Sequence, residues 1–204
     1  MVVRQKILSG GKWGVILFLS VILFSSCSKD PTTPLPLPQP EMKYIDLSGK
    51  EIRQNNSITL DLDSDGKNDL RFHTLLVADP IAKQDKLQFY AMSLVESFLP
   101  VNANEEIPVM NEGDTIFTNN FSNFSWFEIS SIVLVQKVTG ITGPSFWEGP
   151  WKNAAHKFLP IQVKVNQQRF NGWVELSMNI QQQKLVLHKA AICKQAGKNI
   201  KAGL

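Results

Sequence analysis

Residues 61–69 contain four aspartates with the spacing of a cation-binding loop, Asp-x-Asp-x-Asp-Gly-x-x-Asp. Carboxylates at alternate positions of a tight loop can bring their oxygens to one hard cation, and Gly66 permits the sharp turn. The pattern therefore predicts a calcium site. Its expected ligands are oxygens of Asp61, Asp63, Asp65, Lys67 and Asp69, with Lys67 contributing its main-chain carbonyl.

This loop differs from an EF-hand. The twelfth position, where an EF-hand has a bidentate Glu, is Phe72. The flanking segments have the alternating pattern of strands, whereas an EF-hand needs helices, so we expect a weak and structural site. The alternative is a β-hairpin that turns at Asp65-Gly66, with its aspartates simply solvated. Repulsion among four carboxylates favours a bound cation, unless Lys67 and Arg71 offset it.

Cys27 follows a stretch that is typical of a bacterial lipoprotein signal. Arg4, Lys6 and Lys12 form a positive N-terminal region, residues 13–24 are largely apolar, and two serines precede the cysteine. A membrane-spanning helix needs about 20 apolar residues, so this shorter run fits a removable signal peptide. The sequence predicts a lipid such as palmitate on Cys27 and a cell-envelope location, on the periplasmic or surface face of the outer membrane.

The region after Cys27 indicates how the chain is divided. Residues 28–40 contain five prolines, which favour an extended spacer between the lipid and the folded part. We therefore expect a signal peptide at residues 1–26, the lipidated cysteine and Pro-rich spacer at residues 27–43, and a folded domain at residues 44–204.

The charge of the mature chain excludes nucleic acid as an expected partner. The full chain has a net charge of +3, from 21 basic and 18 acidic residues, and the three cations of the signal account for the excess. Residues 27–204 therefore have no basic surplus for phosphates. Cys193 has no disulfide partner once Cys27 is lipidated, and its apolar surroundings predict a buried side chain.

Short segments with strand patterns run through the folded part. Apolar residues alternate strictly at residues 57–62 and 161–165, and β-branched residues fill residues 131–138. Further strands are expected at residues 70–77, 86–94, 114–117, 172–178 and 184–188, a short helical turn at residues 91–99, and long surface connections at residues 102–127. The repeated strand and turn signals predict an all-β fold, an antiparallel β-sandwich.

Four short motifs occur in order along this domain. They are the Asp-rich hairpin, Gly-Asp-x-Ile at residues 113–116, Gly-Trp-Val-x-Leu at residues 172–176 and Ile-x-Ala-Gly at residues 200–203. With them the chain resembles a family of uncharacterised exported bacterial lipoproteins. The resemblance implies a β fold and an exported location, and it implies no particular activity.

Two further features have both a functional and a structural interpretation. Trp126, Trp147 and Trp151 lie in an aromatic-rich region and could stack on a ligand such as a sugar, although tryptophans in a sandwich of this size more often fill the core. Asp114-Thr115-Ile116 resembles the acceptor of a bacterial O-glycosylation system, which predicts a glycan on Thr115; the alternative is an ordinary strand start.

No catalytic residues are assigned from the sequence. The three histidines lack metal-ligand spacing, and the chain has no Gly-x-Ser-x-Gly motif. We therefore expect a lipid-anchored, non-catalytic binding or structural module for glycan or envelope partners. The alternative is a hydrolase of envelope or extracellular polymers, which a Ser–His pair in contact, or two carboxylates facing each other across a cleft, would favour.

Overall fold

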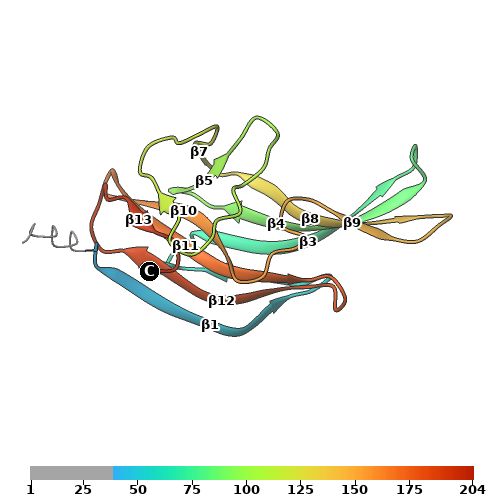
Figure 1. Cartoon of the computed structure of the whole chain (residues 1–204), viewed down its shortest axis with the longest axis horizontal. Helices are drawn as coiled ribbons and strands as arrows, with labels where there is room; N and C mark the ends of the chain where they lie inside the picture. The colour runs from blue at the N-terminus through green and yellow to red at the C-terminus, as the bar shows by residue number, and fades with distance from the viewer. Residues whose placement is uncertain (1–38) are drawn as a thin grey trace, which may run out of the picture. The chain divides into compact units, whose positions relative to one another are not determined.

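The computed structural model describes residues 39–204, which fold as an antiparallel β-sandwich (Figure 1). This confirms the fold class that the sequence predicts. The predicted signal peptide, Cys27 and most of the spacer lie outside the described residues. From residue 39 onward, the chain has no helix long and apolar enough to cross a membrane.

Two sheets form the sandwich. The six-stranded sheet has the order β1-β12-β11-β10-β5-β7, and the five-stranded sheet has the order β2-β3-β4-β8-β9. The strands of the first are β1 (Met42–Ile52), β5 (Ser97–Val101), β7 (Ser125–Glu128), β10 (Lys157–Val165), β11 (Gln168–Asn179) and β12 (Lys184–Cys193). Those of the second are β2 (Ser57–Leu60), β3 (Leu70–Asp79), β4 (Gln84–Ser93), β8 (Ser131–Gly140) and β9 (Phe146–Glu148). A separate pair joins β6 (Thr115–Ile116) to β13 (Ile200–Lys201).

The expected strands all form, with shifted ends, but the helical turn expected at residues 91–99 is wrong. β4 ends at Ser93, Glu96 turns the chain with a φ of +64°, and β5 begins at Ser97. Every residue of β5 is buried. A strand covered on both faces loses the alternation that identifies it in a sequence.

The main core lies between the two sheets. Phe72, Phe89 and Leu134 from the five-stranded sheet and Leu159 and Val174 from the six-stranded sheet are fully buried there. Side chains alternate across a strand, so the residues between these core positions point to the outer faces. The two outer faces differ, and this difference decides where a ligand has access.

A second apolar cluster covers part of the outer face of the six-stranded sheet. Trp173 and Phe158 project from this sheet, and Ile116 of β6 and Ile200 of β13 are buried with them. Residues 102–127, expected as surface connections, therefore contribute a third layer over this sheet. The Gly-Asp-x-Ile and Ile-x-Ala-Gly segments pair with each other here as β6 and β13, over the tryptophan of Gly-Trp-Val-x-Leu.

Two buried amides fasten this third layer to the sheet. The Asn171 side chain donates to the carbonyl oxygens of Lys198 (2.7 Å) and Ile116 (3.3 Å). The Gln162 side chain donates to the carbonyl oxygen of Thr118 (2.7 Å) and to Asn171 Oδ1 (2.9 Å). The carbonyl of the buried Ile116 needs such a partner. Cys193 also belongs to this cluster and is 2% exposed, as its apolar surroundings predict.

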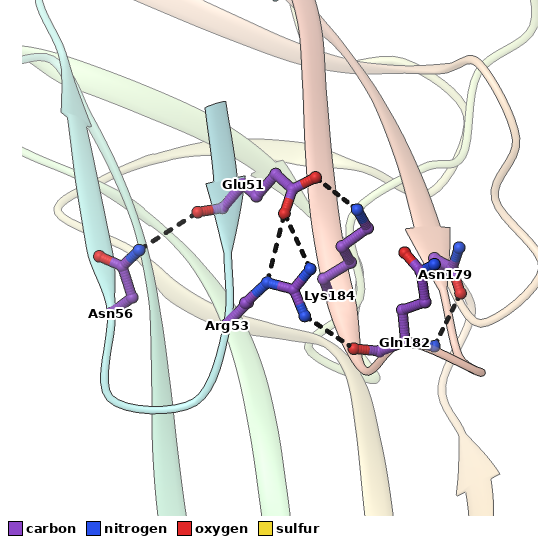
Figure 2. A network of polar contacts seen from close by, with 6 residues as sticks. All are labelled: Glu51, Arg53, Asn56, Asn179, Gln182 and Lys184. Atoms are coloured by element: carbon purple, nitrogen blue, oxygen red, sulfur yellow. Dashed lines mark hydrogen bonds and ion pairs between the residues drawn. The ribbon is translucent and has the colours of Figure 1, made fainter. Parts of the chain in front are cut away.

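A polar network joins the turn between β1 and β2 to the β11–β12 hairpin (Figure 2). The Glu51 carboxylate accepts hydrogen bonds from Arg53 (3.0 Å) and from Lys184, and the bond from Lys184 is the main cause of its lowered pKa. Arg53 also donates to the carbonyl oxygen of Gln182 (3.2 Å), and Asn56 donates to that of Glu51 (3.2 Å). The network lies where the chain passes from one sheet to the other.

Candidate functional site

Residues 61–69 connect β2 to β3 and wind around their own aspartates. The two carboxylate oxygens of Asp61 accept the main-chain N–H groups of Ser64 (2.7 Å) and Gly66 (3.0 Å). Asp63 and Asp65 each accept the N–H two residues later, at 3.0 and 2.8 Å. Ser64 and Gly66 have left-handed φ values of +68° and +88°, which curl the chain. The connection is therefore a compact loop rather than a two-residue hairpin turn.

This winding brings three of the predicted ligands together. One carboxylate oxygen each of Asp61, Asp63 and Asp65 lies within 4.8 Å of the others, a group that could hold a metal ion. Burial raises the pKa of Asp63, and the negative charges of Asp65 and Asp61 raise it further. An all-oxygen donor set suits a hard cation, which would relieve this repulsion.

The fourth predicted side chain, Asp69, lies outside this group. It is 5% exposed, and its carboxylate accepts the Leu62 N–H (2.7 Å) and the Ser97 hydroxyl (3.2 Å). Burial raises the pKa of Asp69 to about 6, and the charge of Asp63 adds to the shift. Leu62 follows β2 and Ser97 begins β5, so Asp69 joins the two sheets instead of facing the three clustered carboxylates.

Two lysines offset part of the loop's negative charge. Lys67 Nζ lies 3.4 Å from Asp65 Oδ2 and 3.6 Å from Glu96 Oε2, and the bond to Asp65 is the main cause of its raised pKa. Lys43 of β1 donates to the carbonyl oxygen of Leu62 (3.1 Å) and to Ser64 Oγ (2.5 Å). The sequence pointed to Lys67 in this role, whereas Lys43 is distant along the chain and only the fold brings it here.

The three tryptophans considered for ligand stacking contribute to packing. Trp151 is fully buried and Trp126 is 8% exposed, and their indole N–H groups donate to the carbonyl oxygens of Ile107 and Asn119, both at 3.3 Å. Trp147 is half-buried against the main core, with its ring 6.0 Å from that of Phe89. Packing and hydrogen bonding hold Trp126 and Trp151 inward, whereas ligand stacking by the half-buried Trp147 stays a prediction.

Thr115 lies at the start of β6, where the sequence predicted an O-linked glycan. Its side chain is half-buried, and its hydroxyl oxygen accepts a hydrogen bond of 2.7 Å from Lys201 of β13. The O-glycosylation of this residue stays a prediction, which the intact mass of the native protein tests.

The outer face of the five-stranded sheet holds a cleft of about 500 Å³. Polar side chains of three strands line it and are linked in one direction: Tyr90 donates to Gln88 (2.6 Å), Gln88 to Gln136 (2.6 Å) and Gln136 to Glu148 (2.5 Å). Sequence reasoning missed this row. The available signal was the alternation in β4, where Gln88 and Tyr90 flank the buried Phe89.

A Ser–His pair lies on the other outer face, near one end of β11 and β12. Ser177 Oγ is 2.8 Å from His188 Nε2, at a bulge in the pairing of these strands. Burial lowers the pKa of His188, and the neighbouring His156 lowers it further. The nearby acid, Glu175, lies 2.6 Å from Nδ1 of His156 rather than against His188. The serine, histidine and acid are therefore not linked in the order that a hydrolase triad needs.

Comparisons with protein-family models, with curated proteins and with solved structures find no significant match. The resemblance to exported bacterial lipoproteins thus stays a prediction from the sequence motifs.

Proposed function

We propose that this protein is a lipid-anchored, non-catalytic binding module of the bacterial cell envelope, with glycan or envelope partners. The observation that supports it best is the contrast between the outer faces of the sandwich. A third layer covers the part of the six-stranded sheet around Trp173 and leaves a hollow beside Tyr44 and His188. The five-stranded sheet has no such layer over Gln88, Gln136 and Glu148, whose side chains are joined by hydrogen bonds along its cleft. Such clefts with convergent polar groups are the usual place for a ligand.

The anchor in this proposal is Cys27, supported by the sequence of residues 1–40. Mass spectrometry of the mature N-terminus should find two or three acyl chains on this cysteine, because one chain gives only marginal membrane binding. Cys27→Ala should release the protein from the outer membrane or leave it unprocessed. A mature protein that still begins at Met1 would contradict the anchor.

The metal in this proposal is calcium, bound by Asp61, Asp63 and Asp65 and fixing the loop that connects β2 to β3. With only three clustered carboxylates we expect a dissociation constant of about 10⁻⁴–10⁻³ M, as in extracellular calcium modules. Calcium at about 100 times that constant would add about 2.7 kcal/mol to the free energy of unfolding.

Thermal unfolding with calcium and with a chelator tests this role. The double variant Asp63→Asn plus Asp65→Asn should lose the calcium-dependent rise in unfolding temperature. Asp85→Asn, which changes an exposed carboxylate of β4 far along the chain from the loop, is the matched control and should keep it. An identical calcium response in all three proteins would leave the loop as a connection without a metal.

A hydrolase of envelope polymers is the second candidate, favoured by the contact between Ser177 and His188. A fluorophosphonate probe, which labels nucleophilic serines, distinguishes the two. Since Glu175 orients the other histidine, we expect no labelling at Ser177. Labelling that Ser177→Ala abolishes would favour the hydrolase instead.

A further inference from the structure

A row of side chains crosses β4, β8 and the edge strand β9 on the open outer face. Leu75 of β3 pairs with Gln88 of β4, Gln88 pairs with Gln136 of β8, and Gln136 pairs with Glu148 of β9. Neighbouring strands are about 4.8 Å apart, so the row presents one hydrogen-bonding group per strand at that spacing. The cleft lies over this row. Glu105 and Glu106, in the loop that follows β5, form part of its wall.

The internal hydrogen bonds of the row leave capacity for a ligand. A side-chain amide has two N–H donors, and each glutamine uses one within the row, so Gln88 and Gln136 each keep one donor. Glu148 accepts through Oε1 and keeps Oε2 as an acceptor, and the Tyr90 oxygen keeps its lone pairs. The row therefore offers a free donor on β4 and another on β8, with free acceptors at its two ends, in positions that the internal bonds hold fixed.

Aromatic rings also lie beside this polar row. The His73 ring stacks on Tyr90, with centroids 4.9 Å apart and an angle of 8° between the planes. Phe146 lies two residues before Glu148 in β9, on the same face of the strand, and is 53% exposed. An exposed ring beside a polar row suits a ligand with both hydroxyl groups and apolar C–H faces.

The charge of the cleft selects among such ligands. Glu105, Glu106 and Glu148 line it, and its other lining side chains are uncharged. An anionic ligand would be repelled. An ammonium ligand could pair with the carboxylates, but it has no acceptor for the free N–H groups of the glutamines. A hydroxyl group both donates and accepts, so it suits both kinds of side chain.

We propose that the row of Tyr90, Gln88, Gln136 and Glu148, with the exposed ring of Phe146, binds an uncharged oligosaccharide laid across β4, β8 and β9. This inference rests on the proposed function, because it names the ligand class and the site of that binding module. It differs from the stacking on tryptophans that the sequence suggested, because its aromatic contact is the exposed ring of Phe146.

The test is a screen of the purified protein against uncharged, acidic and amino-sugar oligosaccharides, followed by titration calorimetry with the best ligand. Gln136→Ala and Phe146→Ala should each weaken binding about tenfold, the effect of losing about 1.4 kcal/mol of contacts. Phe127→Ala and Gln168→Ala are matched controls and should bind like the wild type. Phe127 is 53% exposed, as Phe146 is, but lies in β7 of the other sheet, and Gln168 is exposed at the start of β11.

The outcomes separate this inference from the proposed function. Binding that all four variants retain would overturn the site while keeping the binding module. Preference for acidic glycans, or for a polyamine such as spermine, would overturn the ligand class. Binding to isolated envelope proteins without any glycan binding would overturn this inference alone. Shortening of a bound uncharged oligosaccharide would support the site and overturn the non-catalytic function.

Discussion

The outer faces of the two sheets differ in the residues that point outward and in what lies over them. On the six-stranded sheet the outward residues include Trp173 and Phe158, and a third layer buries them. On the five-stranded sheet they include Gln88, Tyr90 and Gln136, which line a cleft. One sandwich thus buries the middle of one outer face under a third layer and leaves the polar row of the other accessible, so residues needed for folding and residues available to a ligand differ between the two.

Trp173→Ala should give the largest effect on stability, because it removes the central ring of the covered face. Trp173 is fully buried and packs edge-on against Phe158, with ring centroids 5.2 Å apart. We expect a loss of about 3–5 kcal/mol in the free energy of unfolding, measured by urea denaturation. The exposed Phe127→Ala should change it by less than about 0.5 kcal/mol. A loss below about 1 kcal/mol for Trp173→Ala would mean that the third layer contributes little.

Asp69→Asn should change how stability depends on pH. An Asp titrates near pH 3.9 in the unfolded chain, whereas burial raises the pKa of Asp69 to about 6 in the folded protein. The folded state therefore holds a proton that the unfolded state releases between these values, and its stability falls as the pH rises through them. The loss amounts to about 3 kcal/mol. It is complete above pH 6 and absent below about pH 4.

In the Asp69→Asn variant this fall should disappear. An asparagine can accept the Leu62 N–H through Oδ1 and donate to Ser97 Oγ through Nδ2, so both buried contacts have a neutral replacement. Denaturation at several pH values, with chelator present, gives the difference between the two proteins. Parallel profiles would show that Asp69 is ionised throughout, and that the joint between the sheets is a charged one.

The strand pattern of the sequence predicted most of the sandwich but not its third layer. Alternation identified β2 and part of β10, because every second residue there is apolar and faces the main core between the sheets. β5 is buried throughout and β9 has three residues, so neither has a period to detect. Whether residues 102–127 lie over a sheet depends on the pairing of β6 with β13, which are far apart in the chain.

The candidate metal loop was predicted more completely than the cleft. Its three clustered carboxylates lie within five residues, so local turn geometry is sufficient to bring them together. Asp69 departs from the prediction because its position is set by Ser97 in the other sheet. The cleft is built from side chains such as Gln88, Gln136 and Glu148, which only the pairing of three strands makes neighbours.

Asn171→Leu tests how the third layer is fastened. The substitution removes the donors to the carbonyl oxygens of Lys198 and Ile116, and it leaves the carbonyl of the buried Ile116 without this partner. We expect a loss of about 2 kcal/mol in the free energy of unfolding, within the range for buried groups left unsatisfied. Hydrogen exchange should accelerate first in β6 and β13. Uniform acceleration over the whole sandwich would mean that the third layer does not open separately.

Gln136→Ala should have the smallest effect on stability, and it is the counterpart of Asn171→Leu on the open face. Both residues are side-chain amides on outward positions, and both bond to other groups, but Asn171 is 1% exposed whereas Gln136 lies half-buried at the edge of a cleft. When Gln136 is removed, water can reach Gln88 and Glu148, so no polar group stays unsatisfied. We expect a loss of at most about 0.5 kcal/mol, as for other accessible positions. A loss close to that of Asn171→Leu would show that the row holds the sheet together, and the two outer faces would then no longer differ in the way their structures indicate.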